Sequence, residues 1–344
     1  MPRTSAAIPP ATDPADPLGV RSSTSRVMAT ATLVRIDHAR LAAVGRELAD
    51  TATAAPTWTH PLHHRGSPAH TATWVFVLDA LNFCFWSERP DPDDRWRVSW
   101  RGETHDGYWA LAAALSRAVE EGTPLHDPRW LATIDEAAVA HLLRPATSST
   151  PTIPLFEARV NHLQELGRGL INAGGGQEAA LRIVTAAQGS AVRLVQNVVR
   201  QFPSFDDVAA HEGHEVRFYK RAQILVADLA GAFDGEAPAA FLDLDALTAF
   251  ADYKVPQVLR RFGLLHYAPD LAASIARRDL IPAGSRAEIE IRAATVQAVD
   301  LLRHALEAYG RELSASDVDW LLWMAGQSLP PGCEPYHRTS TPFY

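Results

Sequence analysis

The stretch FADYKVPQVLRRFG, from Phe250 to Gly263, places a carboxylate and two aromatic rings just before an apolar run that ends in paired arginines. Its proline, Pro256, fixes a corner, because the ring locks φ and restricts the preceding residue. We therefore expect a turn between two helices that holds Asp252 rigidly beside Phe250 and Tyr253. A carboxylate held in this way can stabilise a positively charged transition state.

Two further carboxylates, Asp243 and Asp245, precede this stretch in the segment LDLDALT. Either can simply cap the helix that follows, because an aspartate oxygen accepts hydrogen bonds from free backbone N–H groups. The alternative is that they reach the same site as Asp252. The local pattern leaves both alternatives open.

Composition favours a small-molecule ligand. The chain has 344 residues, of which 47% are hydrophobic, enough for one large domain or two small ones. Its two cysteines, Cys84 and Cys333, stand far apart, which excludes a thiolate zinc cluster and a disulfide framework and fits the cytoplasm. The formal net charge of -8 argues against a broad basic face for nucleic acid.

The N-terminal residues 1–30 are rich in Pro, Ala, Ser and Thr and lack the apolar segment of a secretory signal. We expect them to be a disordered tail, or to lie upstream of a start at Met28. The longest apolar run, Trp74 to Trp86, is too short to cross a bilayer, which predicts a soluble protein without a membrane partner.

The rest of the chain has mainly helical patterns, and the predicted fold class is mainly α. Alternation in RWRVSWRGETHDG predicts one short β element near residues 95–104. The proline-rich segment from Pro145 to Pro154 is a linker that would divide the chain into lobes 31–145 and 154–344. Glycine-rich phosphate loops of the nucleotide-binding folds are missing from the sequence.

Four histidines, His60, His63, His64 and His70, lie in one segment rich in Pro and Gly. Imidazole is a common metal ligand, but the segment lacks the spacing of a helical zinc site and is more typical of a mobile loop. No metal site is predicted. His60 is retained as a residue that could face a substrate.

Asp79 and Asn82 interrupt an apolar run that contains Phe83 and Trp86. They can be a buried polar pair that satisfies its own hydrogen bonds. They can also form the polar edge of an aromatic wall, which would suit a flat heteroaromatic base. Buried polar groups are costly unless they are used, so both interpretations are kept.

The segment RFYKRAQILVADL contains Tyr219, Lys220 and Arg221 at the start of an amphipathic pattern. A helix with a cationic first turn is the structural interpretation. The functional one is a phosphate monoester site, with the arginine binding in a bidentate manner and the lysine acting as a point charge.

Six runs of the sequence, taken in order, resemble the queuosine salvage proteins, which are queuosine 5′-phosphate N-glycosylases/hydrolases. The runs are WVFVLDALNFCFWSE, GYWALAAALSRAVEEGTP, FYKRAQILVADL, LTAFADYKVPQVLR, EIEIRAATVQAVDLLR and HRTSTPFY. The resemblance extends from about residue 35 to Tyr344 and leaves out only the N-terminal tail.

The resemblance implies one mainly helical domain, residues 31–344, similar to helix-hairpin-helix DNA glycosylases, with FADYKVPQVL at the hairpin. It implies release of the base queuine from its nucleoside 5′-phosphate without a metal or another cofactor. The implied partner is this small molecule and not nucleic acid, and no oligomeric state is predicted. Gln257 stands where many bifunctional DNA glycosylases have a lysine, so a Schiff-base lyase step is not expected.

The implied chemistry gives roles to the residues above. Breaking a C1′–N bond generates an oxocarbenium-like sugar, which a fixed carboxylate stabilises or attacks. The candidate catalytic carboxylates are Asp252, Asp245 and Asp243, with Asp252 as nucleophile or cation stabiliser and the other two holding the base. The candidate substrate-binding residues are His60, Asp79, Asn82, Phe83, Trp86, Tyr219, Lys220, Arg221, Phe250 and Tyr253.

Two alternatives from other classes make different predictions. A DNA-repair glycosylase on the same fold would need a basic groove, which the acidic balance opposes. A non-catalytic helical scaffold would leave Asp252 exposed as a helix cap and would have no pocket.

Overall fold

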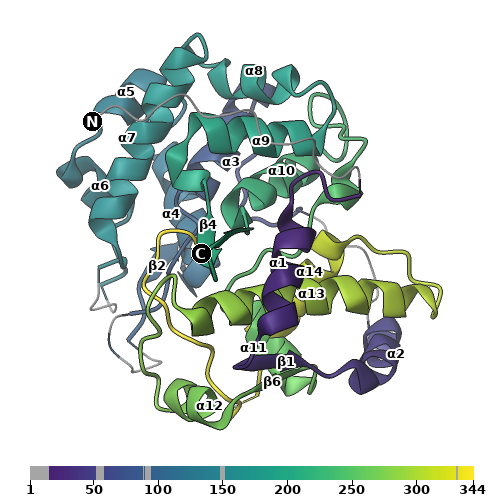
Figure 1. Cartoon of the computed structure of the whole chain (residues 1–344). Coiled ribbons are helices and arrows are strands. Elements are labelled where there is room, and N and C mark those ends of the chain that lie inside the picture. The colour runs from purple at the N-terminus through teal and green to yellow at the C-terminus, as the bar shows by residue number, and fades with distance from the viewer. Residues whose placement is uncertain (1–14, 52–57, 88, 90–93, 148–151, 331) are drawn as a thin grey trace.

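The structure, a computed structural model, describes residues 15–51, 58–87, 89, 94–147, 152–330 and 332–344 (Figure 1). Its helices are α1 (Val20–Thr30), α2 (Leu41–Thr51), α3 (Pro68–Ala80), α4 (Gly107–Glu120), α5 (Pro128–Thr133), α6 (Glu136–Leu142), α7 (Phe156–Asn172), α8 (Ala179–Ala186), α9 (Ala191–Gln201), α10 (Lys220–Ala232), α11 (Lys254–Arg261), α12 (Pro269–Ala276), α13 (Arg286–Glu307) and α14 (Ala315–Gln327). Its strands are β1 (Val34–Ile36), β2 (Arg97–Trp100), β3 (Glu103–Asp106), β4 (Val208–His211), β5 (His214–Arg217) and β6 (Leu265–Tyr267), and its 3-10 turns are η1 (His38–Arg40), η2 (Pro203–Phe205) and η3 (Leu244–Ala246).

The mainly α class predicted from the sequence is confirmed. Several helices begin at a serine or aspartate whose side chain accepts a backbone N–H, which satisfies one of the free donors at a helix start. Ser314 and Asp317 form a reciprocal capping box at the start of α14. Among the described helices none is both long and apolar enough to cross a membrane.

The strands form small antiparallel pairs, β1 with β6, β2 with β3, and β4 with β5. The β2–β3 hairpin confirms the short β element predicted near residues 95–104. The β1–β6 pair joins the N-terminal region to the segment after α11, so it ties distant parts of the chain together.

The buried apolar side chains form two main cores. The larger core contains residues of α3 to α10, and the smaller contains residues of α2, α11, α12 and α14 with β1 and β6. Helix α13 contributes to both, with Ile289 in the larger core and Ile291 in the smaller. The predicted lobe boundary at residues 145–154 does not divide these cores, because α5 and α7, on either side of it, pack together.

One glycine explains how closely α5 and α7 approach. A Cβ at Gly167 of α7 would lie 2.1 Å from the backbone N of Ala132 in α5, closer than any real contact. Only glycine therefore fits at this crossing. Sequence periodicity could not show this contact, because it depends on the tertiary arrangement of two helices.

The predicted disordered tail over residues 1–30 is wrong for residues 20–30, which form α1. Figure 1 shows α1 lying across α13, and the two helices pack together. Val20 and Val27 are buried, and Gln297 of α13 donates a hydrogen bond to the Thr24 hydroxyl at 2.8 Å. The Ser- and Thr-rich composition hides a helix that tertiary contacts stabilise. Residues 1–14 lie outside the described part of the chain.

A buried ion cluster stands where α13 meets the larger core. Both terminal nitrogens of Arg292 donate to Asp207, at 3.0 and 2.6 Å, and its Nε donates to the carbonyl oxygen of Ala251 at 3.0 Å. The Glu288 carboxylate lies 3.5 Å from the same guanidinium. Asp207 also accepts the backbone N–H of Lys220, so the cluster fixes the start of α10 and the segment before Asp252.

Replacing Arg292 with methionine is expected to lower the free energy of unfolding by about 3–5 kcal/mol, because two buried carboxylates lose their cation. Urea denaturation measures the change. The control is Arg303→Met, on the same helix, which removes partly exposed pairs with Asp300 and Glu307 and should cost less than about 1 kcal/mol. Equal effects of the two substitutions would contradict a special role for the buried cluster.

Candidate active site

A central pocket lies where the end of α3, the start of α4, α10, α14 and the segment before α11 meet. It encloses about 860 Å³, including its open mouth. It is lined by Asn82, Phe83, Cys84, Phe85, Arg95, Asp106, Gly107, Tyr108, Lys220, Ile224, Asp228, Phe250, Asp252, Tyr253, Lys254, Asp319, Trp320, Trp323, Gln327 and Tyr344. Carboxylates, cations and aromatic rings from distant segments therefore share one space.

Asp252 is held at the wall of the central pocket by the helix that follows it. Its Oδ1 accepts the backbone N–H groups of Lys254 and Val255, at 2.8 and 2.9 Å, which are free donors at the start of α11. Its Oδ2 takes part in no hydrogen bond with the described residues, and the side chain is only 8% exposed. Asp252 thus caps a helix and also presents a fixed carboxylate oxygen to the pocket, which contradicts the exposed cap of the scaffold alternative.

The charge of Asp252 acts on a second buried carboxylate, Asp319. Burial raises the pKa of Asp252, while Lys220 and the two N–H donors lower it. Burial also raises the pKa of Asp319 well above its usual value, and the Asp252 charge raises it further. Asp319 receives one hydrogen bond, from the Phe250 N–H at 2.9 Å. Asp252 is therefore the first of the two to ionise, and Asp319 is the one that keeps its proton.

Lys220 is a buried cation whose positive charge lowers the pKa values of both Asp252 and Asp319. Its Nζ donates to the carbonyl oxygen of Asn82 at 3.1 Å. Burial lowers the pKa of Lys220 to about 8, against the opposing attraction of Asp252. A lysine with this pKa is charged near neutral pH and loses its charge under mildly alkaline conditions.

Aromatic rings form the walls of the central pocket. Phe83, Phe250 and Tyr253 come from the segments singled out in the sequence, and Trp320 and Trp323 are added by α14. The two tryptophan rings stack with centroids 5.3 Å apart. Such walls suit a flat heteroaromatic ring, which gains contact area against aromatic faces.

Two cations that the sequence analysis missed lie at the less buried side of the central pocket. Arg95 donates to Asp106 at 2.9 Å and to the Tyr336 hydroxyl at 3.1 Å. Lys254 is half-buried, and its Nζ lies 5.5 Å from the centre of the Tyr336 ring. Lys254 stands within the stretch quoted first, but nothing in the local pattern shows which way a lysine at a helix start points.

Comparison with known proteins shows the family of this chain. The family described as Queuosine salvage protein matches residues 62–344 of the chain. The chain belongs to this family. A queuosine 5′-phosphate N-glycosylase/hydrolase of Sphaerobacter thermophilus is 50% identical over 332 residues, which cover 96% of this chain and 99% of that protein.

Animal proteins with the same name are also similar to this member of the queuosine salvage family. The Bos taurus protein is 37% identical over 295 residues, covering 83% of this chain and 85% of its own length. The Mus musculus protein is 34% identical over 341 residues, covering 95% of this chain and 99% of its own.

Arg221 and Trp86 do not lie where a substrate-binding role requires. Arg221 is buried and donates to the carbonyl oxygens of Asp79, Ala80 and Ser204, so its guanidinium is committed to the fold. The Trp86 ring lies 4.8 Å from the guanidinium carbon of Arg338 and does not line the central pocket. Neither residue lines the central pocket, so the structure lends no support to their predicted contacts with phosphate and base.

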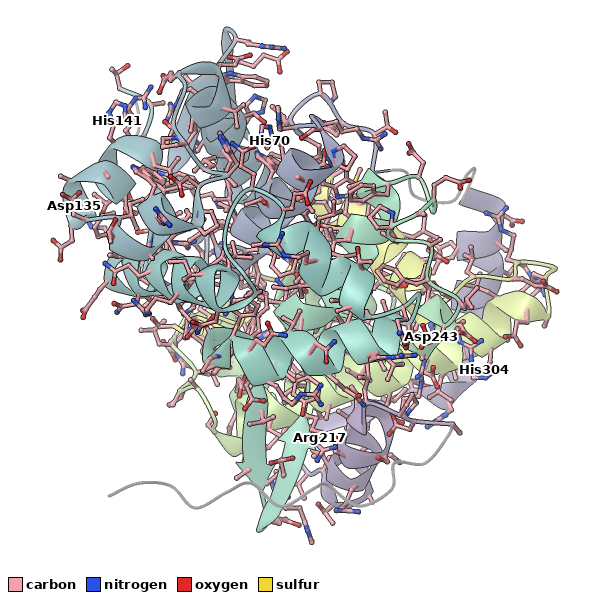
Figure 2. The ribbon with its side chains drawn as sticks, turned by 90° about the horizontal axis from the view of Figure 1, so that it is seen from above. His70, Asp135, His141, Arg217, Asp243 and His304 are labelled. Carbon is pink, nitrogen blue, oxygen red and sulfur yellow. The ribbon has the colours of Figure 1, made fainter. Side chains whose placement is uncertain are left out.

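Asp243 and Asp245 also lie outside the central pocket. Asp243 accepts the Ser190 hydroxyl at 2.7 Å and the Ala191 N–H at 2.5 Å, which caps α9, and Figure 2 labels it beside this teal helix. Asp245 is exposed in η3. The capping alternative thus describes Asp243, although the helix it caps comes earlier in the chain, and the predicted base-holding role has no support from either position.

His60 and Tyr219 are likewise separated from the central pocket. The His60 ring stacks on Trp109 at 4.0 Å and lines a different cavity with His63 and His64. Tyr219 precedes α10 in the left-handed region, at φ 49°, and is not among the pocket residues. Among the described residues no group of three or more His, Cys, Asp or Glu side chains is arranged to hold a metal ion.

Both interpretations of Asp79 and Asn82 describe part of the structure. The Asn82 side-chain amide donates to Asp79 Oδ1 at 3.2 Å, whereas Asp79 Oδ2 is buried without a hydrogen-bond partner among the described residues. Asn82 also lines the central pocket, whereas Asp79 is completely buried behind it. Only Asn82 is placed to touch a ligand.

Proposed function

We propose that this protein hydrolyses the N-glycosidic bond of queuosine 5′-phosphate and releases queuine for reuse in tRNA modification. One observation supports this most strongly. In a chain related to queuosine 5′-phosphate N-glycosylases/hydrolases, Asp252 presents a fixed carboxylate oxygen to a pocket with aromatic walls. This arrangement suits cleavage beside a flat base.

The reaction begins as the C1′–N bond breaks and its electron pair leaves with the base. Positive charge then develops on the sugar, and the ionised Asp252 either stabilises that charge or attacks C1′. Water supplies the oxygen that ends on C1′, and the products are queuine and ribose 5-phosphate. The 7-deazapurine has no N7 to protonate, and Asp319, which keeps its proton, is the acid available to the departing base.

The central pocket is more buried at one end than at the other, and this difference suggests how the substrate is oriented. The base lies at the buried end near Asn82 and Phe83, and the ribose reaches Asp252. The phosphate then lies at the more open side, where Lys254 and Arg95 are half-buried. A charged phosphate loses less hydration there than it would at the buried end.

We propose that the helical domain is related to helix-hairpin-helix DNA glycosylases, with FADYKVPQVL, from Phe250 to Leu259, at the hairpin position. We also propose a cytoplasmic protein that acts on the free nucleotide without binding nucleic acid, which the net charge of -8 supports.

The test is incubation of the purified protein with queuosine 5′-phosphate and detection of queuine and ribose 5-phosphate by mass spectrometry. We expect both products in equal amounts, and we expect no change after treatment with EDTA. Failure to release queuine, combined with release of a damaged base from duplex DNA, would replace this proposal by the repair-glycosylase alternative.

The pocket charges predict a bell-shaped dependence of kcat/KM on pH. Asp252 must be ionised and its pKa is raised, so activity is lost as pH falls through that raised pKa. The Lys220 pKa is lowered to about 8, so its charge is lost, and activity with it, as pH rises through about 8. Steady-state kinetics from pH 4 to 10 test this.

The control for the alkaline limb is Lys220→Arg, because a guanidinium stays charged throughout this range. Whatever its absolute activity, this variant should lack the decline near pH 8. An alkaline limb that is unchanged in Lys220→Arg would show that another group titrates there.

A further inference from the structure

A second cavity adjoins the central pocket between α10 and α14. It encloses about 470 Å³, and it shares Asp228, Phe250 and Trp320 with the central pocket. Trp58 lines this cavity and lies very close to α10. A Cβ at Gly231 would lie only 2.6 Å from the Trp58 Cβ, so only glycine fits there. Asp228 is the charged side chain among the three that line both spaces.

Asp228 is a buried carboxylate whose Oδ2 has no hydrogen-bond partner among the described residues. The side chain is 8% exposed, and its Oδ2 is enclosed and unpaired. The Trp58 indole N–H lies in the wall of the second cavity near enough to lower the pKa of Asp228, but it falls short of hydrogen-bond geometry with the carboxylate. A buried carboxylate in this condition is costly, and a cationic ligand would relieve the cost.

The charges around Asp228 are compatible with an additional cation at this carboxylate. Burial and the charge of Asp228 raise the pKa of Asp79 well above its usual value, so Asp79 stays protonated. Burial raises the pKa of Asp228 to about 7, against the opposing effects of Trp58 and Lys220. The Lys220 ammonium also interacts electrostatically with Asp252 and Asp319, so its positive charge is shared among several carboxylates. An additional cation at Asp228 would hold that carboxylate ionised.

We propose that Asp228 binds the secondary ammonium group of the queuosine side chain and that the second cavity receives the cyclopentenediol beyond it. This inference rests on the proposed function. It assigns to Asp228 the part of substrate selectivity that distinguishes queuosine from a plain 7-deazaguanosine. The ammonium is the cation that this substrate carries, and the diol hydroxyls find polar groups at Ser316 and Asp317 in the second cavity.

The shape of the site favours the ammonium over the guanine edge as the ligand of Asp228. A carboxylate that read the ring N–H groups would end the binding site at the ring, and the second cavity would stay unused. The side chain leaves the ring through its ammonium and continues for a five-membered ring, which matches a second cavity that has Asp228 in its wall.

Two substrates separate these roles of Asp228. The Asp228→Asn variant should lose about 10- to 100-fold in kcat/KM for queuosine 5′-phosphate, the range of one charge-assisted hydrogen bond. For 7-deazaguanosine 5′-phosphate, which lacks the side chain, it should match the wild type within about twofold. Turnover of this second substrate also shows that the variant is folded.

The matched control is Asp234→Asn, which removes a carboxylate just beyond the end of α10 where it pairs with exposed Arg65 outside both cavities. This variant should treat both substrates as the wild type does. In Asp228→Asn, equal losses on the two substrates, or no loss on either, would overturn the inference.

A test on the unmodified protein avoids any effect of folding. A queuosine 5′-phosphate analogue in which oxygen replaces the side-chain nitrogen is neutral at this point, and the wild type should use it about 10- to 100-fold less well. Equal use of the analogue would overturn the inference while leaving the proposed function in place. If the wild type cleaves neither queuosine 5′-phosphate nor the analogue, the proposed function itself is wrong.

Discussion

Replacing Asp252 with asparagine is expected to lower kcat for queuosine 5′-phosphate by about a hundredfold or more, the usual cost of losing one preorganised electrostatic group. Asparagine keeps an oxygen that can accept the N–H groups of Lys254 and Val255, so the cap on α11 should survive. What it removes is the negative charge facing the developing oxocarbenium ion. Single-turnover kinetics measure the loss directly.

Binding of free queuine should change far less in Asp252→Asn, because the product has no charge at an anomeric carbon. Asp243→Asn is the matched control: it alters a carboxylate that caps α9 outside the central pocket, so kcat should stay near the wild-type value. Near-normal kcat in Asp252→Asn, together with a large loss in Asp243→Asn, would reverse this assignment of the catalytic carboxylate.

Replacing Lys254 with methionine is expected to lower kcat/KM for queuosine 5′-phosphate by about 10- to 100-fold, the range of one hydrogen bond to a charged group. The side chain lies at the half-buried side of the central pocket, where the phosphate is proposed to bind. Methionine keeps most of the length of the apolar stem and removes the ammonium, which lies 5.5 Å from the centre of the Tyr336 ring. Steady-state kinetics with the nucleotide and with queuosine lacking the phosphate test the effect.

The nucleoside should react equally well with the wild type and Lys254→Met, because it carries no phosphate to lose. Arg261→Met is the control on the same helix, since Arg261 is exposed and contacts Cys333 outside the central pocket. A loss of the same size for nucleoside and nucleotide would mean that Lys254 supports α11 and does not bind the phosphate.

The parts of the site that sequence reasoning located are those with local causes. Asp252 precedes a helix by two residues, and its cap bonds reach only Lys254 and Val255. The β2–β3 hairpin and the Ser314 cap of α14 likewise depend on neighbours in the chain. Interactions of this short range can be predicted from residue type and spacing.

The errors come from side chains whose direction depends on packing. Lys220 and Arg221 are adjacent, but successive residues of a helix point about 100° apart, so one lines the central pocket and the other bonds inside the larger core. Asp243 and Asp252 stand in similar surroundings in the sequence, yet Asp243 reaches α9 and Asp252 reaches α11. The spacing of residues in the sequence therefore cannot predict which of these side chains reaches the central pocket.

The sequence by itself determined the mainly helical class, the membership of the queuosine salvage family and the stretch that holds Asp252. Only the tertiary structure decided which other groups meet Asp252, because Asp228, Asp319 and Arg95 are brought together from α10, α14 and the segment before β2. It also decided their charges, because pKa values depend on burial and on neighbours that are distant in the chain. Short-range hydrogen bonds and helical periodicity can be predicted from residue type and spacing. The desolvation of carboxylates and the interactions between them arise only after the chain has folded.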